Sequence, residues 1–129
     1  MREILRLEIH VDEVHHVDGA GGGVTMILFS GHASGPCFTG EILPGGVDTQ
    51  THDAENGTAL SARYMLEGTD EGGRPCRMFI ENNAKAGEKY TRPRIVTDSK
   101  SLQYLEKSEL FGEIETVDSQ LSIKIFICE

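Results

Sequence analysis

The sequence has few cysteines and no long apolar run. Its three cysteines, Cys37, Cys76 and Cys128, are widely spaced and form no Cys-x-x-Cys pair, so neither a disulfide framework nor a zinc knuckle is expected. Free thiols are typical of a reducing cytoplasm. No run approaches the roughly 18–20 apolar residues of a membrane span, and the charged, alternating residues 1–8 do not resemble a signal peptide. We therefore expect a soluble, cytoplasmic protein that does not act at membranes.

Positive charge is also scarce. The chain carries 12 Lys and Arg residues against 21 Asp and Glu residues, a formal net charge of -9. The basic residues are scattered and form no stripe that would neutralise successive phosphates, and an acidic surface repels nucleic acid and anionic lipid. Nucleic acid is therefore not an expected partner.

Motifs for cofactors and metals are missing as well. The glycine-rich residues 19–23 lack the pattern of a phosphate-binding loop and precede a β-branched segment, which favours a hairpin connection. His15 and His16 are adjacent, so on a strand they point to opposite faces. No metal or cofactor is predicted, although one alternative stays open, in which His32 and His52 converge with Asp48 as a two-histidine, one-carboxylate site.

An alternation of apolar and polar residues with a period of two runs through most of the chain, which predicts β-strands. The only predicted helix is Lys100–Lys107, which Asp98 or Ser99 would cap; residues 51–57 are predicted to be a polar loop. We expect strands at residues 5–11, 24–33, 38–43, 58–67, 75–82, 90–97, 110–117 and 121–128.

These elements predict an all-β fold with a single domain spanning residues 1–129. About eight to ten short antiparallel strands are typical of a barrel or a sandwich. We favour a closed, calycin-like antiparallel barrel with one short helix, because closure removes exposed sheet edges.

The strongest candidate for a functional site is the run from Gly40 to Gln50, where Pro44 and two glycines end a strand. Asp48 follows the glycines and is a plausible proton acceptor, with Gln50 beside it as a ligand-binding residue. The alternative is that Asp48 only bonds the amides of its own turn. His32, flanked by glycines on the preceding strand, is a further candidate for ligand binding or an ordinary strand residue.

Other polar side chains are candidates for the same site. Arg63 lies opposite the apolar face of its strand, so it either points to solvent or enters a polar lumen, where it would stabilise an oxyanion or a carboxylate. Tyr90 and Arg92 share one face of an extended segment, as do Glu81 and Asn83. These four residues would complete a polar lumen or form a solvated rim.

Several motifs in order resemble the domain-of-unknown-function 3237 family. They are Gly35-Pro36, Gly40, the run from Pro44 to Gln50, the run from Ala62 to Glu67, and Tyr90-Thr91-Arg92. The resemblance covers nearly the whole chain and implies a small, oligomeric antiparallel barrel with the polar motif near one mouth, without a settled activity. Thr49 stands where many relatives have an aromatic residue, so a ligand that stacks there would be bound differently.

Three functions remain open from the sequence. The first is a binding module for a small, partly apolar molecule, oriented by Asp48, Arg63, Tyr90 and Arg92. The second is a cofactor-free isomerase, cyclase or lyase in which Asp48 transfers a proton and an arginine stabilises the oxyanion. The third is a structural subunit of a homo-oligomer.

Overall fold

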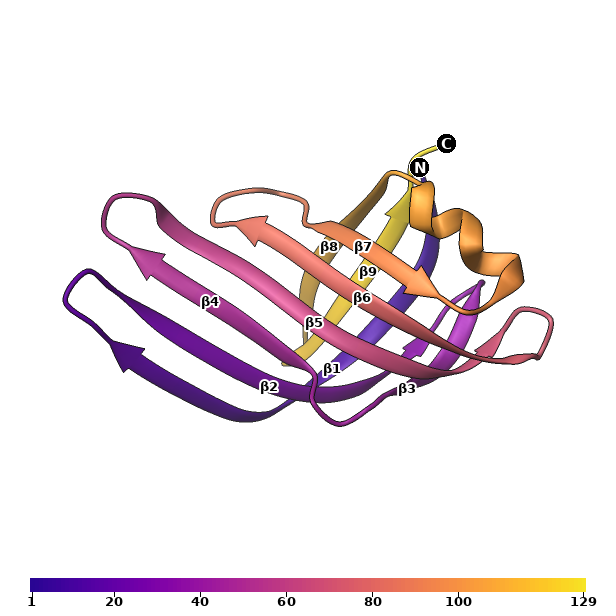
Figure 1. The fold of residues 1–129 in the computed structure, drawn as a ribbon, viewed down its shortest axis with the longest axis horizontal. Coiled ribbons are helices and arrows are strands. Elements are labelled where there is room, and N and C mark those ends of the chain that lie inside the picture. The colour runs from indigo at the N-terminus through magenta and orange to yellow at the C-terminus, as the bar shows by residue number, and fades with distance from the viewer.

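The computed structural model describes residues 1–129, which form nine strands and one short helix (Figure 1). The strands are β1 (Arg2–Asp18), β2 (Gly22–Ser34), β3 (Phe38–Ile42), β4 (Val47–Asp53), β5 (Gly57–Asp70), β6 (Pro75–Lys85), β7 (Arg92–Thr97), β8 (Leu110–Val117) and β9 (Gln120–Ile127), and the helix is η1 (Lys100–Lys107). All strand pairs are antiparallel, which confirms the predicted fold class. No helix has the length and hydropathy that a membrane span requires.

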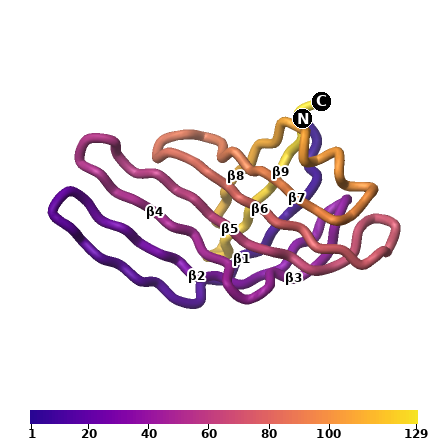
Figure 2. The backbone as a smooth tube through the Cα atoms, viewed as in Figure 1, coloured from indigo at the N-terminus to yellow at the C-terminus, as the bar shows by residue number.

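The sheet curls into a barrel in the order β7-β6-β5-β3-β2-β1-β9-β8. It closes where Thr91, just before β7, pairs with Gly112 on β8, through backbone hydrogen bonds of 2.9 and 3.1 Å. The β1–β2 and β4–β5 hairpins and the β6–β7 connection project at one end, and the helix lies at the other end with both chain termini (Figures 1 and 2).

Strand β4 corrects the sequence prediction, which placed a polar loop over residues 51–57. Residues 47–53 pair with β2 on one side and with β5 on the other, so every backbone group of this polar segment has a neighbouring strand. Asp is depleted in strands, but strand propensity depends strongly on tertiary context. The alternation of Val47, Thr49 and Thr51 with polar residues is the signal in the sequence that fits this strand.

The core fills the barrel at the end covered by the helix. Twenty-one hydrophobic residues are buried there, and five of them, Leu7, Leu66, Ile80, Leu102 and Ile125, have no exposed surface. Most of those on the strands alternate with more exposed residues, as a period of two requires. The helix adds Leu102 and Leu105 to the same core and closes this end.

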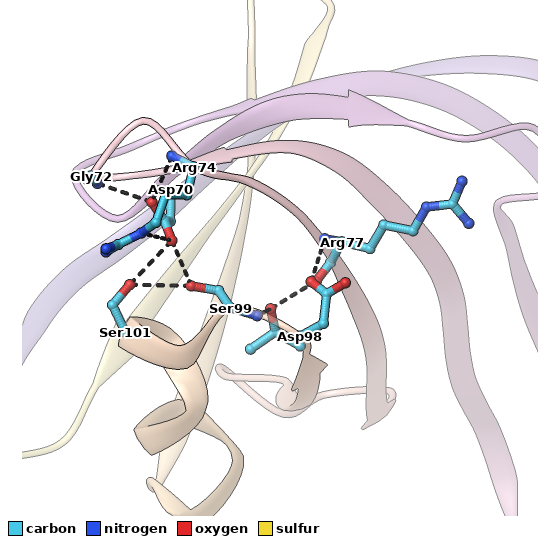
Figure 3. A network of polar contacts seen from close by, with 8 residues as sticks. Asp70, Gly72, Arg74, Arg77, Asp98, Ser99 and Ser101 are labelled. Carbon is cyan, nitrogen blue, oxygen red and sulfur yellow. Dashed lines mark hydrogen bonds and ion pairs between the residues drawn. The ribbon is translucent and has the colours of Figure 1, made fainter.

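The helix is confirmed in its position, but it is a 3-10 helix and its predicted capping is wrong. Ser99 occupies the N-cap position without a side-chain capping bond. Its hydroxyl instead donates to Asp70, with 2.8 Å between Ser99 Oγ and Asp70 Oδ2, and Asp98 accepts from the backbone N–H of Arg77 (Figure 3).

Asp70 is the buried centre of this polar network. Its Oδ1 accepts from the backbone N–H groups of Gly72 and Arg74, and its Oδ2 accepts from the hydroxyls of Ser99 and Ser101 (Figure 3). The hydrogen bond from Ser99 lowers the pKa of Asp70 most, and with the two backbone N–H groups and the charge of Arg74 it brings the pKa to about 2. One carboxylate therefore ties the β5–β6 turn to the start of the helix.

We expect acid to destabilise the protein through Asp70. Because its folded pKa is about 2 and its ordinary value is 3.8, the ionised carboxylate stabilises the fold above about pH 4, and this contribution is lost as the pH falls toward 2. Asp70→Asn should lower the melting temperature at neutral pH by about 5 °C and lose less additional stability than the wild type between pH 4 and 2. Circular dichroism melts across this range test it, with Glu71→Gln in the same turn as control. Equal acid losses in the wild type and Asp70→Asn would contradict it.

Candidate functional site

A cavity of about 230 Å³ lies inside the barrel, next to the core. Of its 14 lining residues 10 are hydrophobic, and they come from seven strands and from Thr91. The lining consists of Ile9, Val11, Ile27, Phe29, Asp48, Gln50, Leu60, Ala62, Asn82, Ala84, Thr91, Ile114, Leu121 and Ile123. The cavity is thus an apolar chamber with four polar side chains in its wall.

Asp48 lies in the wall on β4. It is flanked across the sheet by Ile27 on one side and Ala62 on the other, both of which also line the cavity. Its Oδ2 accepts a hydrogen bond of 3.0 Å from Gln50 Nε2, and its Oδ1 is buried without any partner. Asp48 is therefore bonded to Gln50 and does not close its own turn, and one of its oxygens remains free to accept a hydrogen bond from a molecule in the cavity.

Asn82 and Thr91 face the same cavity from the other side of Ala62. Asn82 pairs with Ala62 across the sheet, two strands from Asp48, which is roughly 10 Å at the usual strand spacing. Asn82 Oδ1 and Thr91 Oγ1 are both buried without a partner. Gly112 makes room for them, because a Cβ at Gly112 would lie 2.2 Å from Thr91 Oγ1 and 3.4 Å from Asn82 Nδ2.

Tyr64 is the fourth buried side chain with an unpartnered polar atom, its hydroxyl. It follows Ala62 on the inner face of β5, and its ring meets Phe29 edge-on, with 5.3 Å between ring centroids. Burial raises the pKa of Tyr64, so its hydroxyl keeps its proton. Tyr64 thus supports the cavity wall at Phe29 from the core side.

Beyond the cavity, polar side chains continue along the inner face of the β1–β2 hairpin. Gln50 pairs with Thr25 across the sheet, and Thr25 pairs with His16. His16 Nδ1 lies 2.7 Å from Thr25 Oγ1, and His16 Nε2 lies 2.8 Å from Asp18 Oδ1. The neighbouring His15 contacts Glu13, a residue of the opposite strand face, as the adjacency of the two histidines predicted.

Arg63 is not in the cavity: of the two positions that the sequence left open for it, solvent or a polar lumen, the structure has the first. Its side chain is 66% exposed on the outer face of β5, where its Nε lies 2.9 Å from Glu81 Oε2. Glu81 also contacts Arg94 on the same face. The aliphatic face of β5 is the lumen face, so Arg63 and Glu81 form a surface ion pair.

Asn83, Tyr90 and Arg92 also lie outside the cavity. Tyr90 and Arg92 share a face as predicted, but they do so over the ring of Phe111, at 6.0 Å between the ring centroids and 5.0 Å from Arg92 Cζ to the Phe111 centroid. Asn83 and Arg92 line a separate, shallow depression on the outer surface. Of the predicted site residues, only Asp48 and Gln50 come together in the cavity.

Asn82 and Thr91 are the functional candidates that sequence reasoning missed. Each is one residue away from a predicted site residue, and in a strand a shift of one residue exchanges the two faces. The signal for Asn82 is present in the sequence, because Cys76, Met78 and Ile80 alternate as buried residues and Asn82 continues their series.

The alternative metal site at His32 and His52 is not formed. His32 is exposed near the end of β2, whereas His52 pairs with Gly23 near its start and contacts Thr58. Nine residues of β2 separate these positions, roughly 30 Å in an extended strand. No group of three or more potential metal-ligating side chains occurs in the structure.

The fold and the cavity define a class of small antiparallel β-barrels with an apolar chamber and a few buried polar groups. The chain belongs to the family described as protein of unknown function DUF3237, whose sequence profile matches residues 1–83. It is 34% identical over 84 residues to a UPF0311 protein of Clostridium acetobutylicum. That alignment covers 63% of this chain and about half, 51%, of the relative's length.

Solved structures resemble this fold over almost its whole length. A crystal structure of a protein with unknown function from Clostridium acetobutylicum has a TM-score of 0.79 at 25% identity, covering 99% of this chain and 95% of that chain. A β-barrel-like protein from Acinetobacter baumannii has a TM-score of 0.74 at 14% identity, covering 99% and 94%. An enzyme from Penicillium herquei has a TM-score of 0.69 at 15% identity, covering 97% and 92%. The last two likenesses concern the fold alone.

The closure of the barrel beside the cavity should require that residue 112 has no side chain, as Gly112 does. Gly112→Ala should lower stability by about 1–3 kcal/mol, as overpacking does, because the new Cβ would overlap Thr91 Oγ1. Adding Thr91→Ala removes that oxygen and leaves only an ordinary contact with the Thr91 Cβ position at 3.6 Å. The double variant should therefore recover most of the loss in urea unfolding. Additive losses in the double-mutant cycle would show that the two residues do not meet.

Proposed function

We propose that the protein binds a small, mainly apolar molecule in the barrel cavity. The observation that carries this proposal is the set of three buried polar atoms without a partner, Asp48 Oδ1, Asn82 Oδ1 and Thr91 Oγ1, in an otherwise apolar wall. A buried polar group that lacks a hydrogen bond costs about 1–3 kcal/mol. A bound molecule that supplies the missing hydrogen bonds would remove this cost.

The chemistry of the wall limits the ligand. An ionised carboxylate only accepts hydrogen bonds, so Asp48 would select a hydroxyl or amine group. Asn82 and Thr91 can donate and accept, and they would bind a second polar group on the opposite side of the molecule. The cavity of about 230 Å³ lies just below the usual range of ligand pockets, roughly 300–1,000 Å³. The expected ligand is therefore small, with an apolar ring or chain between two polar edges.

Filling the cavity should abolish binding. Ala62 lies between Asp48 and Asn82 on the inner face, so Ala62→Leu would occupy the ligand's place. We expect substituted phenols and benzylamines to raise the melting temperature of the wild type. A ligand at 100 times its Kd adds about 2.7 kcal/mol to the free energy of unfolding. Toluene analogues, which lack the polar group, should raise the melting temperature less. None of these compounds should raise the melting temperature of Ala62→Leu.

The matched control is Ala59→Leu, which adds the same side chain on the outer face of the same strand, where Ala59 is exposed. It should keep the wild-type response to the phenols and benzylamines. Binding that survives in Ala62→Leu, or a wild type that none of these probes stabilises, would refute the cavity as the binding site.

Asp48 also favours a second candidate function, cofactor-free acid/base catalysis. Gln50 Nε2 holds one carboxylate oxygen at 3.0 Å, and the other oxygen is buried and unpartnered against the cavity. That oxygen would accept a proton from an acidic C–H bond of the bound molecule and return it to another atom of that molecule. The donors for a developing oxyanion would be Asn82 and Thr91, because Arg63 lies on the outer face.

Asp48→Asn separates the two functions. With small hydroxyaryl ketones as probes, an acid/base enzyme would exchange their α-protons for deuterium in D₂O, and the variant should be about 10²–10⁴-fold slower. Nuclear magnetic resonance follows the exchange, and thermal shifts show whether the ketone still binds. If the ketone binds but exchanges no faster with wild type than with Asp48→Asn, the protein binds without this chemistry.

A further inference from the structure

The outer half of β1 has an unpaired edge. Strand β9 pairs with β1 only from Arg2 to Ile9. From His10 to Asp18, β1 has β2 on one side and no strand on the other, and all nine residues are exposed. We call this segment the β1 edge. A strand edge of this kind presents free N–H and C=O groups and pairs readily with another strand.

The β1 edge is also rich in exposed apolar residues. Val11, Val14 and Val17 are 45%, 56% and 64% exposed. They are three of the ten large hydrophobic residues that the whole chain exposes, within nine residues of sequence. The edge contains neither lysine nor proline, which proteins commonly use to protect such strands.

The sequence of the β1 edge is complementary to itself when it is read antiparallel around Val14. In this register each valine meets a valine, and every acidic residue meets a histidine. The pairs are Val14 with Val14, Glu13 with His15, Asp12 with His16, Val11 with Val17, and His10 with Asp18. Val14 is also the midpoint of the unpaired segment, so this register centres the edge on the axis.

We propose that two copies of this chain form a symmetric dimer through the β1 edge, with Val14 on the two-fold axis. A two-fold interface brings the same segment of both copies together and therefore requires a surface that complements itself. Antiparallel edge pairing would satisfy the free backbone groups and place oppositely charged partners side by side.

Neighbouring registers are unfavourable, which makes this one specific. Within the regular segment from Glu13 onward, a two-fold axis through Glu13 would set Glu13 opposite itself, and an axis through His15 would set Val14 opposite His16 and Glu13 opposite Val17. Like charges directly opposite each other destabilise a strand pair. Only the axis through Val14 avoids both.

The groups that would pair across the dimer already contact such partners within one chain. His15 lies 3.1 Å from Glu13, and His16 lies 2.8 Å from Asp18. Exposed pairs of this kind contribute little to stability, so exchanging them for the other copy's residues costs little. A β-bulge between Val11 and Glu13 interrupts the outer pairs, and the regular part of the interface is therefore Glu13, Val14 and His15.

The dimer would also bring the cavity walls of the two copies together. Val14 pairs with Ile27, and Ile27 pairs with Asp48, so the three side chains share the inner face of the sheet. Pairing at Val14 would continue this inner face from one barrel into the other. The wall that carries Asp48 would then extend across the two-fold axis.

Sedimentation velocity on the full chain tests the proposal. The wild type should sediment as a dimer, and His15→Glu should be monomeric because Glu13 would then face a glutamate in both symmetric contacts. The exchange Glu13→His with His15→Glu restores opposite partners and should restore the dimer. Val14→Lys should also give monomers, whereas Val96→Lys, a similar change at an exposed valine of β7, should not.

Cysteine cross-linking tests the register. Paired Cα atoms in an antiparallel ladder lie about 4.5–5.5 Å apart, within the range of disulfides. With the exposed Cys128 replaced by serine, Val14→Cys should form a disulfide-linked dimer on oxidation. Val17→Cys should not link to itself, because the two copies of Val17 lie three residues on either side of the axis, roughly 20 Å apart.

Three results would overturn the proposal. They are a monomeric wild type at millimolar concentration, a dimer that both His15→Glu and Val14→Lys leave intact, and efficient self-linking of Val17→Cys without that of Val14→Cys. None of these results bears on ligand binding, which the Ala62→Leu comparison tests in the same protein.

Discussion

The pairing of Thr91 with Gly112 is the contact on which the rest of the structure depends. Without it the nine strands would form an open, curled sheet; with it β8 and β9 lie across from β5 and β6 and enclose a chamber. The same contact brings Thr91 Oγ1 and Asn82 to the chamber wall, and it requires a residue without a side chain at position 112. The contact that closes the barrel thus also shapes the chamber wall.

The interior divides into two parts with different physical roles. Toward the helix, fully buried aliphatic residues fill the barrel, and Asp70 fastens the helix to the β5–β6 turn. Toward the hairpins, the filling stops and unpartnered polar atoms face an apolar space. A stable, well-packed half can hold Asp48 and Asn82 in place despite their missing hydrogen bonds, which is the usual relation between a rigid scaffold and a binding site.

The unequal lengths of the strands explain the unpaired β1 edge. Strand β1 has 17 residues, but β9 has eight and ends its pairing at Ile9. A closed barrel removes edges only as far as its shortest strands extend. The long hairpins leave one edge uncovered next to the chamber. The proposed dimer interface therefore lies beside the proposed ligand site.

The sequence by itself determined most of the strands, the antiparallel class and the barrel, and it made Asp48 and Gln50 candidates for the site. These follow from local information, since a period of two is visible in residues such as Leu5, Leu7 and Ile9, and turns have characteristic residues. Strand β4 was missed because polar residues reveal a strand only when neighbours pair with both of its sides.

Only the tertiary structure decided which face of each strand lines the chamber. Curling the sheet turned the aliphatic face of β5 inward, so Arg63 faces solvent and Ala62 lies between Asp48 and Asn82. The alternation in the sequence marks two faces, but the direction in which a sheet curls depends on all strands together. For that reason Asn82 and Thr91, one residue from the predicted positions, became the wall of the site.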